Sequence, residues 1–198
     1  KVPSSQIVQF AFKELGLINS FGGVIVPSLA SLFGIFLIRQ YTIALPDDLL
    51  DAWSAITALA LDGVRRCFDR AGTPAHLRLH GDCHAGNVLW TDDGPHFVDF
   101  DDARMGPAVQ DLWMLLSGDA HEMAGQLADV IEGYRQFCDF DHRELLLVEA
   151  LRTLRMLHHA AWLARRWEDP AFPLAFPWFA SPRYWEDLIL ALREQLAA

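Results

Sequence analysis

Lysine is almost absent from this chain of 198 residues, since Lys1 and Lys13 are the only lysines. Residues 1–50 carry balanced charges, whereas the rest of the chain has far more acidic than basic residues, and the formal net charge is −10. Binding to nucleic-acid phosphates requires clustered lysine and arginine side chains. The charge pattern therefore excludes broad nucleic-acid binding as the function.

Cysteine is also scarce. Cys67, Cys83 and Cys138 are odd in number and far apart, which excludes a disulfide framework and a C-x-x-C metal pair. We therefore expect a reducing, cytoplasmic compartment. Repeats and low-complexity tracts are absent too, and with 52% hydrophobic residues the chain can bury a core rather than remain disordered.

Charge is missing from one long segment, residues 16–38, which reads GLINSFGGVIVPSLASLFGIFLI. A helix of this length could cross a bilayer, which makes a membrane a candidate partner. Pro27 and four glycines dilute the hydrophobicity of the segment. A buried helix or hairpin in a soluble domain is the alternative interpretation.

The remaining chain shows the patterns of short strands followed by helices. Asp47 and Asp48 begin an apolar periodic stretch that Gly72 and Pro74 end, which predicts a helix at about 47–70. The sequence also predicts short strands within 76–80, 88–90 and 96–100, and helices at roughly 109–118, 121–138, 142–167 and 183–197, with a proline-rich break at 169–182. The fold class that we expect is α+β, mainly α.

The stretch HGDCHAGNVLWTDDGPHFVDFDD, residues 80–102, gathers most of the candidate chemistry, and three interpretations were compared. In the first, His80 and His84 with Asp82 bind zinc, but the neighbouring glycines argue against the helix that such a pair needs. In the second, Cys83 is a nucleophile with a neighbouring histidine as base. Residues adjacent in sequence rarely point correctly toward one another for this purpose.

The third interpretation is phosphoryl transfer, which we favour. That reaction needs a carboxylate to orient the attacking hydroxyl and hard oxygen ligands to hold Mg²⁺ on the nucleotide phosphates. Asp82, Asn87 and Asp99 supply these groups. A loop from Asp82 to Asn87, followed by a hairpin that returns the chain to Asp99, would bring the three side chains together.

The same residues carry a family resemblance. H-x-D-x-x-x-x-N followed by an apolar strand and an aspartate resembles the protein-kinase-like superfamily, in the variant shared by aminoglycoside phosphotransferases and choline kinases. A GPxxQDLWxLL helix follows. LRLHGDCHAGNVLW, VDFDDARMGPAVQDLWMLLSGD and AAWLARRWEDPAFPLAFPW are similar to a branch formed by bacterial stress-response Ser/Thr kinases, over about residues 53–198.

The resemblance implies a role for each matching residue. Asp82 would be the catalytic base, with His80 as a scaffold residue of the catalytic loop. Asn87 and Asp99 would be the Mg²⁺ ligands. Asp111 would brace the loop, and an ordinary acid near a helix N-terminus is its alternative interpretation.

Three further candidates come from proximity in the sequence. Asp101 follows Asp99 closely enough to support a metal ligand. Arg78 and Arg104 flank the loop and are the nearest cations for the nucleotide phosphates, because this region contains no lysine.

The first part of the chain departs from the kinase pattern. No phosphate-binding loop and no lysine on a strand are recognisable there, so the resemblance implies a carboxy-terminal lobe without a complete amino-terminal lobe. Residues 15–52 instead resemble a transmembrane segment of the permease subunits of sugar ABC transporters. We therefore expect two parts, an apolar permease-like segment at 1–52 and a kinase-like lobe at 53–198, in a truncated or chimeric chain.

The function that we predict is a Mg²⁺- and ATP-dependent phosphotransferase acting on a Ser or Thr hydroxyl of a protein. One alternative is a permease fragment in the inner membrane, fused to an inactive kinase lobe. Another is an interaction module that keeps the kinase fold without the activity.

Overall fold

The computed structural model describes residues 45–197, which fall into two compact units. One unit contains residues 45–67 and 149–197, and the other contains residues 68–148. The expected apolar segment at 16–38 lies outside the described residues. Among the helices of residues 45–197, none is long and apolar enough to span a membrane.

Helix α4 (Asp47–Ala71) confirms the helix expected at 47–70. Its first turn contains Asp47 and Asp48 and its last turn contains Arg70, so the charges complement the helix dipole at both ends. The helix ends at Gly72, which adopts a φ of 74° and donates its N–H to the carbonyl of Phe68 at 3.0 Å. Glycine tolerates this left-handed conformation without steric cost.

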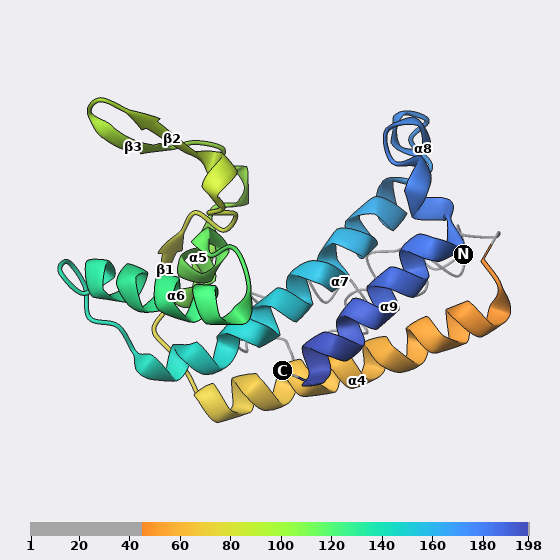
Figure 1. Cartoon of the computed structure of the whole chain (residues 1–198), viewed down its shortest axis with the longest axis horizontal. Coiled ribbons are helices and arrows are strands. Elements are labelled where there is room, and N and C mark those ends of the chain that lie inside the picture. The colour runs from red at the N-terminus through yellow and green to blue at the C-terminus, as the bar shows by residue number, and fades with distance from the viewer. Residues whose placement is uncertain (1–44, 198) are drawn as a thin grey trace. The chain divides into compact units, whose positions relative to one another are not determined.

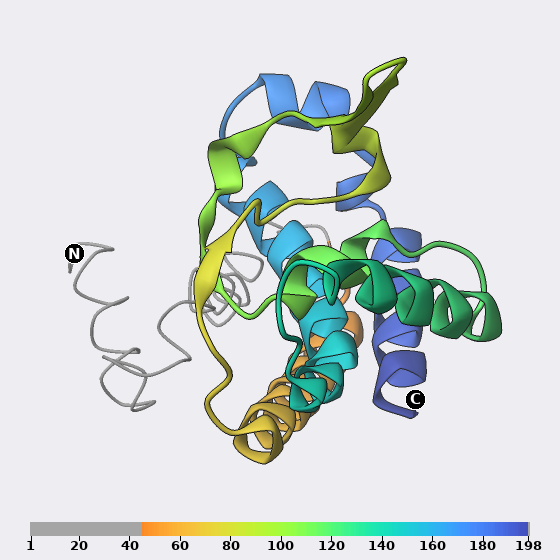
Figure 2. The ribbon, with the colours of Figure 1, turned by 90° about the vertical axis from the view of Figure 1, so that its left-hand side faces the viewer.

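The first unit is built from α4, α7 (Val148–Arg166) and α9 (Pro182–Ala197). These helices lie side by side, with α7 running opposite to the other two (Figures 1 and 2). Apolar side chains at helical spacing meet between them, and Trp53 packs edge-to-face on Trp185 with ring centroids 5.1 Å apart. The core also contains Ile56, Ala60, Leu157, Leu163, Phe179 and Leu192.

The proline-rich connector is more ordered than the sequence suggested. Instead of an irregular break, it forms the short helix α8 (Ala171–Ala175) and the 3₁₀ turn η5 (Pro177–Ala180). Its aromatic side chains explain the order, because Phe179 is fully buried and its carbonyl accepts the indole N–H of Trp185 at 2.8 Å. Packing of these rings outweighs the helix-breaking tendency of the prolines.

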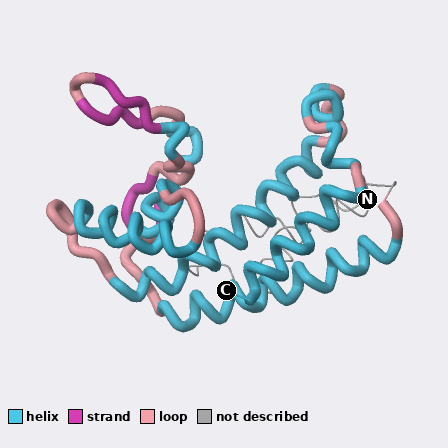
Figure 3. The backbone as a smooth tube through the Cα atoms, viewed as in Figure 1, coloured by secondary structure: helices cyan, strands magenta, loops and turns pink. Residues whose placement is uncertain are grey.

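The second unit contains two small antiparallel sheets, and helices make up most of the rest (Figure 3). Strand β1 (Leu77–Leu79) pairs with β4 (Arg104–Gly106), and β2 (Val88–Thr91) pairs with β3 (Gly94–Phe97). The first three strands confirm the expected ones with small shifts in their ends. The sequence analysis missed β4.

The helices of the second unit are shorter than predicted. The expected helix 109–118 is α5 (Val109–Leu112) followed by the 3₁₀ turn η3 (Trp113–Leu115), because Leu116 is extended and Gly118 has a φ of 96°. Helix α6 (Ala120–Tyr134) starts at a capping box formed by Asp119 and Glu122. The first turns of the expected helix 142–167 form a separate 3₁₀ segment, η4 (His142–Leu147). The α+β, mainly α composition is confirmed for the described residues.

Candidate active site

Asp111 on α5 holds the start of the candidate catalytic loop. Its two carboxylate oxygens accept the backbone N–H groups of His80, at 2.7 Å, and of Gly81, at 2.9 Å. Hydrogen bonds to a charged acceptor are among the stronger ones in proteins. The residue directly before Asp82 is thereby fixed to a helix that lies 30 residues further along the chain.

Gly81 is required by the path of this loop. Its φ is 88°, and a Cβ atom there would lie 2.1 Å from the carbonyl oxygen of Asp102. No side chain fits at that distance. The loop therefore packs closely against the turn that follows Asp99.

His80 connects the loop to the end of strand β3. The side chain is buried, and Nε2 donates to the carbonyl of Val98 at 2.8 Å. Nδ1 faces the backbone N–H of Asp82 at 3.4 Å, and the ring packs on Phe100 with centroids 4.6 Å apart. With both nitrogens engaged in the fold, His80 is suited to positioning the loop.

Asp82 lies beside a histidine whose tautomer is defined by its neighbours. Nδ1 of His84 accepts the backbone N–H of Gly86 at 3.0 Å, so the ring proton is on Nε2. That Nε2 lies 3.6 Å from Oδ2 of Asp82. Gly86 makes room for the ring, because a Cβ at this position would lie 2.8 Å from Cε1 of His84.

Asn87 ends the short 3₁₀ turn η1 (Ala85–Asn87) and is buried. Its side-chain NH₂ donates to the carbonyl of Asp82 at 3.0 Å, so its amide oxygen is the atom suited to bind a cation. Its backbone carbonyl accepts the N–H of Val98 at 3.0 Å. The hairpin β2–β3 thus returns the chain to Asn87 immediately before Asp99.

Asp99 adopts an unusual backbone conformation. Its φ and ψ are 65° and 63°, and it is the one non-glycine residue with positive φ among residues 45–197. Left-handed conformations cost energy for residues with a Cβ and concentrate at functional sites. The side chain is exposed, between two residues that His80 contacts, Val98 and Phe100.

Two of the further candidates, Asp101 and Arg104, lie in the turn after Asp99 and at the start of strand β4. Asp101 is exposed in the 3₁₀ turn η2 (Phe100–Asp102). Arg104 donates from Nε to the carbonyl of Asp102 at 2.8 Å and from Nη2 to its carboxylate at 2.6 Å. Arg104 therefore stabilises the turn that packs on Gly81.

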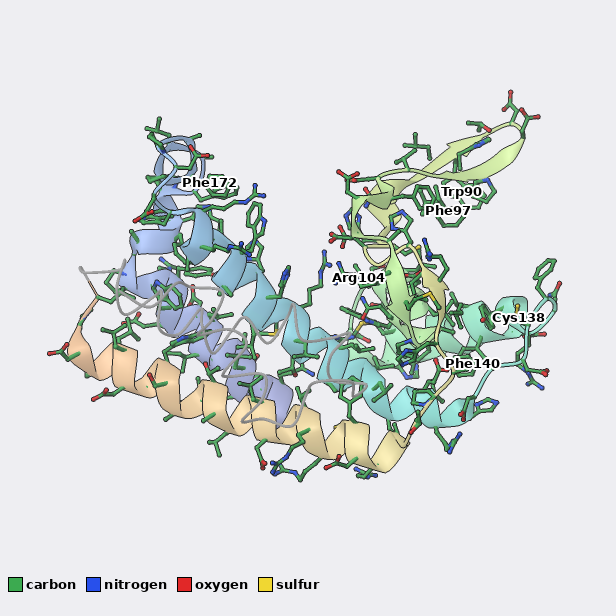
Figure 4. The ribbon with its side chains drawn as sticks, turned by 180° about the vertical axis from the view of Figure 1, so that it is seen from behind. Trp90, Phe97, Arg104, Cys138, Phe140 and Phe172 are labelled. Atoms are coloured by element: carbon green, nitrogen blue, oxygen red, sulfur yellow. The ribbon has the colours of Figure 1, made fainter. Side chains whose placement is uncertain are left out.

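The hairpin itself presents an aromatic face. Trp90 opposes Pro95 and Val88 opposes Phe97 in the register, which puts all four on one side of the two strands. Trp90 is 77% exposed and Phe97 46% exposed, and both side chains extend from the same side of the ribbon (Figure 4).

The structure disfavours the nucleophile interpretation of the loop. Burial raises the pKa of the Cys83 thiol to about 11, with Asp111 and Asp82 adding to the effect, so the thiolate needed by a nucleophile is scarce at neutral pH. Within residues 45–197, no group of three or more His, Cys, Asp or Glu side chains is arranged to hold a metal ion. All three cysteines are unpaired, as expected.

Glu144 was not recognised from the sequence. Its side chain is 3% exposed, and it accepts the backbone N–H of Val109 at the start of α5 at 2.9 Å. His84 was considered only as a zinc ligand or a base for Cys83. The D-x-H spacing of Asp82 and His84 could have indicated that these two side chains lie close together. Glu144 lies in an apolar run, where no local pattern indicates its partner.

Comparisons with known proteins identify relatives of this chain. Stress response kinase A of Escherichia coli K12 is 62% identical over 109 residues, which are 55% of this chain and 33% of that protein. Stress response kinase A of Salmonella choleraesuis and the serine/threonine protein kinase RdoA of Salmonella typhimurium are each 56% identical over 121 residues, 61% of this chain and 37% of theirs. The chain thus spans about a third of the length of these relatives.

A family model matches a longer stretch, residues 36–148, which is more than half of the chain and includes the loop, the hairpin and α5. The chain belongs to the phosphotransferase enzyme family.

Proposed function

We propose that this chain carries the phosphoryl-transfer residues of a Mg²⁺- and ATP-dependent kinase. The observation that supports this most strongly is the pair of hydrogen bonds that the Asp111 carboxylate accepts from the backbone N–H groups of His80 and Gly81. It fixes the loop directly before Asp82 and so fixes the direction of that carboxylate. Catalysis of phosphoryl transfer depends mainly on such positioning and on electrostatic stabilisation.

Asp82 is the catalytic base in this proposal. Its carboxylate orients the acceptor hydroxyl and takes up its proton as the phosphoryl group is transferred. The side chain is only partly exposed, and the Nε2–H of His84 faces one carboxylate oxygen.

Asn87 and Asp99 would hold Mg²⁺. Both supply hard oxygen atoms, and Mg²⁺ in kinases is bound by few protein ligands together with water and phosphate oxygens. Asn87 lies directly before the β2–β3 hairpin and Asp99 lies shortly after it. The NH₂ group of Asn87 is already hydrogen-bonded within the loop. When bound, the ion would neutralise charge on the nucleotide phosphates. Asp101 and Arg104 are supporting candidates in the adjoining turn.

The acceptor that we propose is a Ser or Thr hydroxyl of a protein, and the cellular role is in a stress response. Both proposals rest on the names of the relatives, stress response kinase A and serine/threonine protein kinase RdoA. A cytoplasmic location and the division into parts at 1–52 and 53–198 belong to the same proposal. Membrane association through residues 16–38 stays a prediction.

Transfer of labelled phosphate from MgATP to a generic protein acceptor, followed by identification of the phosphorylated amino acid, tests the proposal. We expect phosphoserine or phosphothreonine, loss of transfer when Mg²⁺ is chelated, and a strong decrease in Asp99→Asn. Asp92→Asn in the hairpin turn is the matched control and should transfer normally. Absence of transfer by a folded sample, or transfer that is insensitive to Mg²⁺ and to Asp99→Asn, contradicts the proposal.

A further inference from the structure

Glu144 is a buried carboxylate whose partner is a backbone N–H group. It belongs to η4, it is 3% exposed, and it accepts a hydrogen bond from the backbone N–H of Val109 at 2.9 Å. Within residues 45–197, no arginine, lysine or histidine forms an ion pair with it. A buried acid without a cationic partner is costly and needs its hydrogen bonds.

The N–H group that Glu144 accepts belongs to Val109, the first residue of α5. The first N–H groups of a helix have no acceptor within that helix and need one from elsewhere. The next two are satisfied locally, by the Gln110 and Asp111 contacts to the carbonyls of Pro107 and Ala108. Glu144 therefore completes the hydrogen bonding of this short helix from a segment 35 residues away.

Asp111 repeats the same arrangement one step closer to the reaction. Glu144 accepts the first N–H group of α5, and Asp111 on α5 accepts two consecutive N–H groups of the loop that carries Asp82. Glu144 therefore holds the start of α5, and Asp111 on α5 holds the loop. A shift of α5 would move Asp111 relative to the loop.

We infer that Glu144 is a positioning residue for phosphoryl transfer, which holds α5 in place so that Asp111 can fix the catalytic loop. This inference rests on the proposed function. Displacement of a catalytic group by about 1 Å can reduce the rate by roughly 10²-fold, so a distant carboxylate can affect turnover strongly. The effect should appear in kcat rather than in KM for ATP.

Asp119→Ala is the matched control for Glu144→Ala. Asp119 also caps a helix of the same unit, since its carboxylate accepts the N–H groups of His121 and Glu122 at 2.9 Å, but α6 carries no residue of the candidate site. We expect both substitutions to lower the melting temperature. We expect only Glu144→Ala to lower kcat, by roughly ten- to 100-fold. Glu144→Gln keeps an acceptor oxygen and should recover most of that loss.

A double-mutant cycle tests whether Glu144 acts through Asp111. In an Asp111→Asn background, Glu144→Ala should cause little further loss of kcat, because the connection is already broken. If the loss of kcat in the double variant equalled the product of the losses in the two single variants, the inference would be overturned. If kcat fell equally in Glu144→Ala and Asp119→Ala, and only as far as the folded fraction of each sample fell, the inference would also be overturned.

Amide hydrogen exchange gives a readout that needs no transfer activity. Glu144→Ala should speed exchange at the His80 and Gly81 amides by more than about tenfold relative to Asp119→Ala. The reason is that a displaced α5 moves the Asp111 carboxylate away from these two amides, so their hydrogen bonds open more often. Unchanged exchange at both amides would contradict the inference. An inactive wild-type chain with this exchange pattern would count against the proposed function and leave the positioning role supported.

Discussion

Nε2 of His84 lies 3.6 Å from Oδ2 of Asp82, and the N–H of Gly86 fixes the ring in the tautomer that puts a proton on this nitrogen. The imidazole therefore presents a donor to the candidate base. His84→Ala should lower kcat by roughly two- to threefold, because an N–H dipole at 3.6 Å stabilises the carboxylate only weakly, with little change in KM for ATP. Steady-state kinetics of phosphate transfer measures both constants.

The control for that substitution is His121→Ala, an exposed histidine in the first turn of α6. It should leave both constants unchanged. Wild-type kinetics in His84→Ala would contradict a role for this imidazole.

Gly81→Ala should be much more destabilising than Gly94→Ala. Both glycines have positive φ, 88° and 110°, so both substitutions incur backbone strain of about 1 kcal/mol. At Gly94 a Cβ meets nothing within 4 Å, whereas at Gly81 it would lie 2.1 Å from the Asp102 carbonyl oxygen. We expect an additional loss of roughly 2 kcal/mol or more in the free energy of unfolding, measured by urea denaturation. Equal losses in the two variants would show that the loop does not pack on this turn.

Cys83 should resist alkylation in the folded protein. Its pKa of about 11 reflects burial first and then the negative charges of Asp111 and Asp82, so the thiol stays protonated at neutral and mildly alkaline pH. Cys138 is exposed and should react first with iodoacetamide, as located by peptide mass spectrometry. In urea the three cysteines should react at similar rates. Rapid labelling of Cys83 in the folded state would revive the nucleophile interpretation.

Glu144 should make stability fall as pH rises. Burial raises the pKa of this carboxyl above its usual 4.5, and the negative charge of Asp141 adds to the effect, whereas the hydrogen bond from the Val109 N–H opposes it. The folded state then binds the proton more tightly than the unfolded state, so the stabilisation is complete below pH 4.5 and is lost as pH rises through the folded-state pKa. The unfolding free energy of wild type relative to Glu144→Gln should decrease over this range. A flat or rising difference would contradict the assignment.

The elements that local patterns define were predictable. Helix α4 has acidic residues at its start and a glycine at its end, and the loop carries Asp82 and Asn87 within one turn of chain. The structure puts these residues and Asp111 in one unit, and their catalytic roles stay predictions. Strand β4 was missed because three residues show no alternation and become a strand only by pairing with β1.

Long-range contacts explain what the sequence could not reveal. The bond between Glu144 and Val109 joins residues 35 apart, and an acid within an expected helix gives no sign of such a partner. Helix α5 ends early because Gly118 adopts a positive φ, although the apolar pattern continues to that point. The positive φ of Asp99 likewise depends on the hairpin and on His80, which no local pattern encodes.

The single-turnover rate of phosphate transfer from MgATP, compared between wild type and Asp82→Asn at equal nucleotide occupancy, tests the central claim most directly. The substitution removes the proton acceptor and keeps the size of the side chain. We predict a rate lower by roughly 10²- to 10⁴-fold with unchanged affinity for the nucleotide. A rate within a few-fold of wild type would contradict the assignment of Asp82 as the catalytic base.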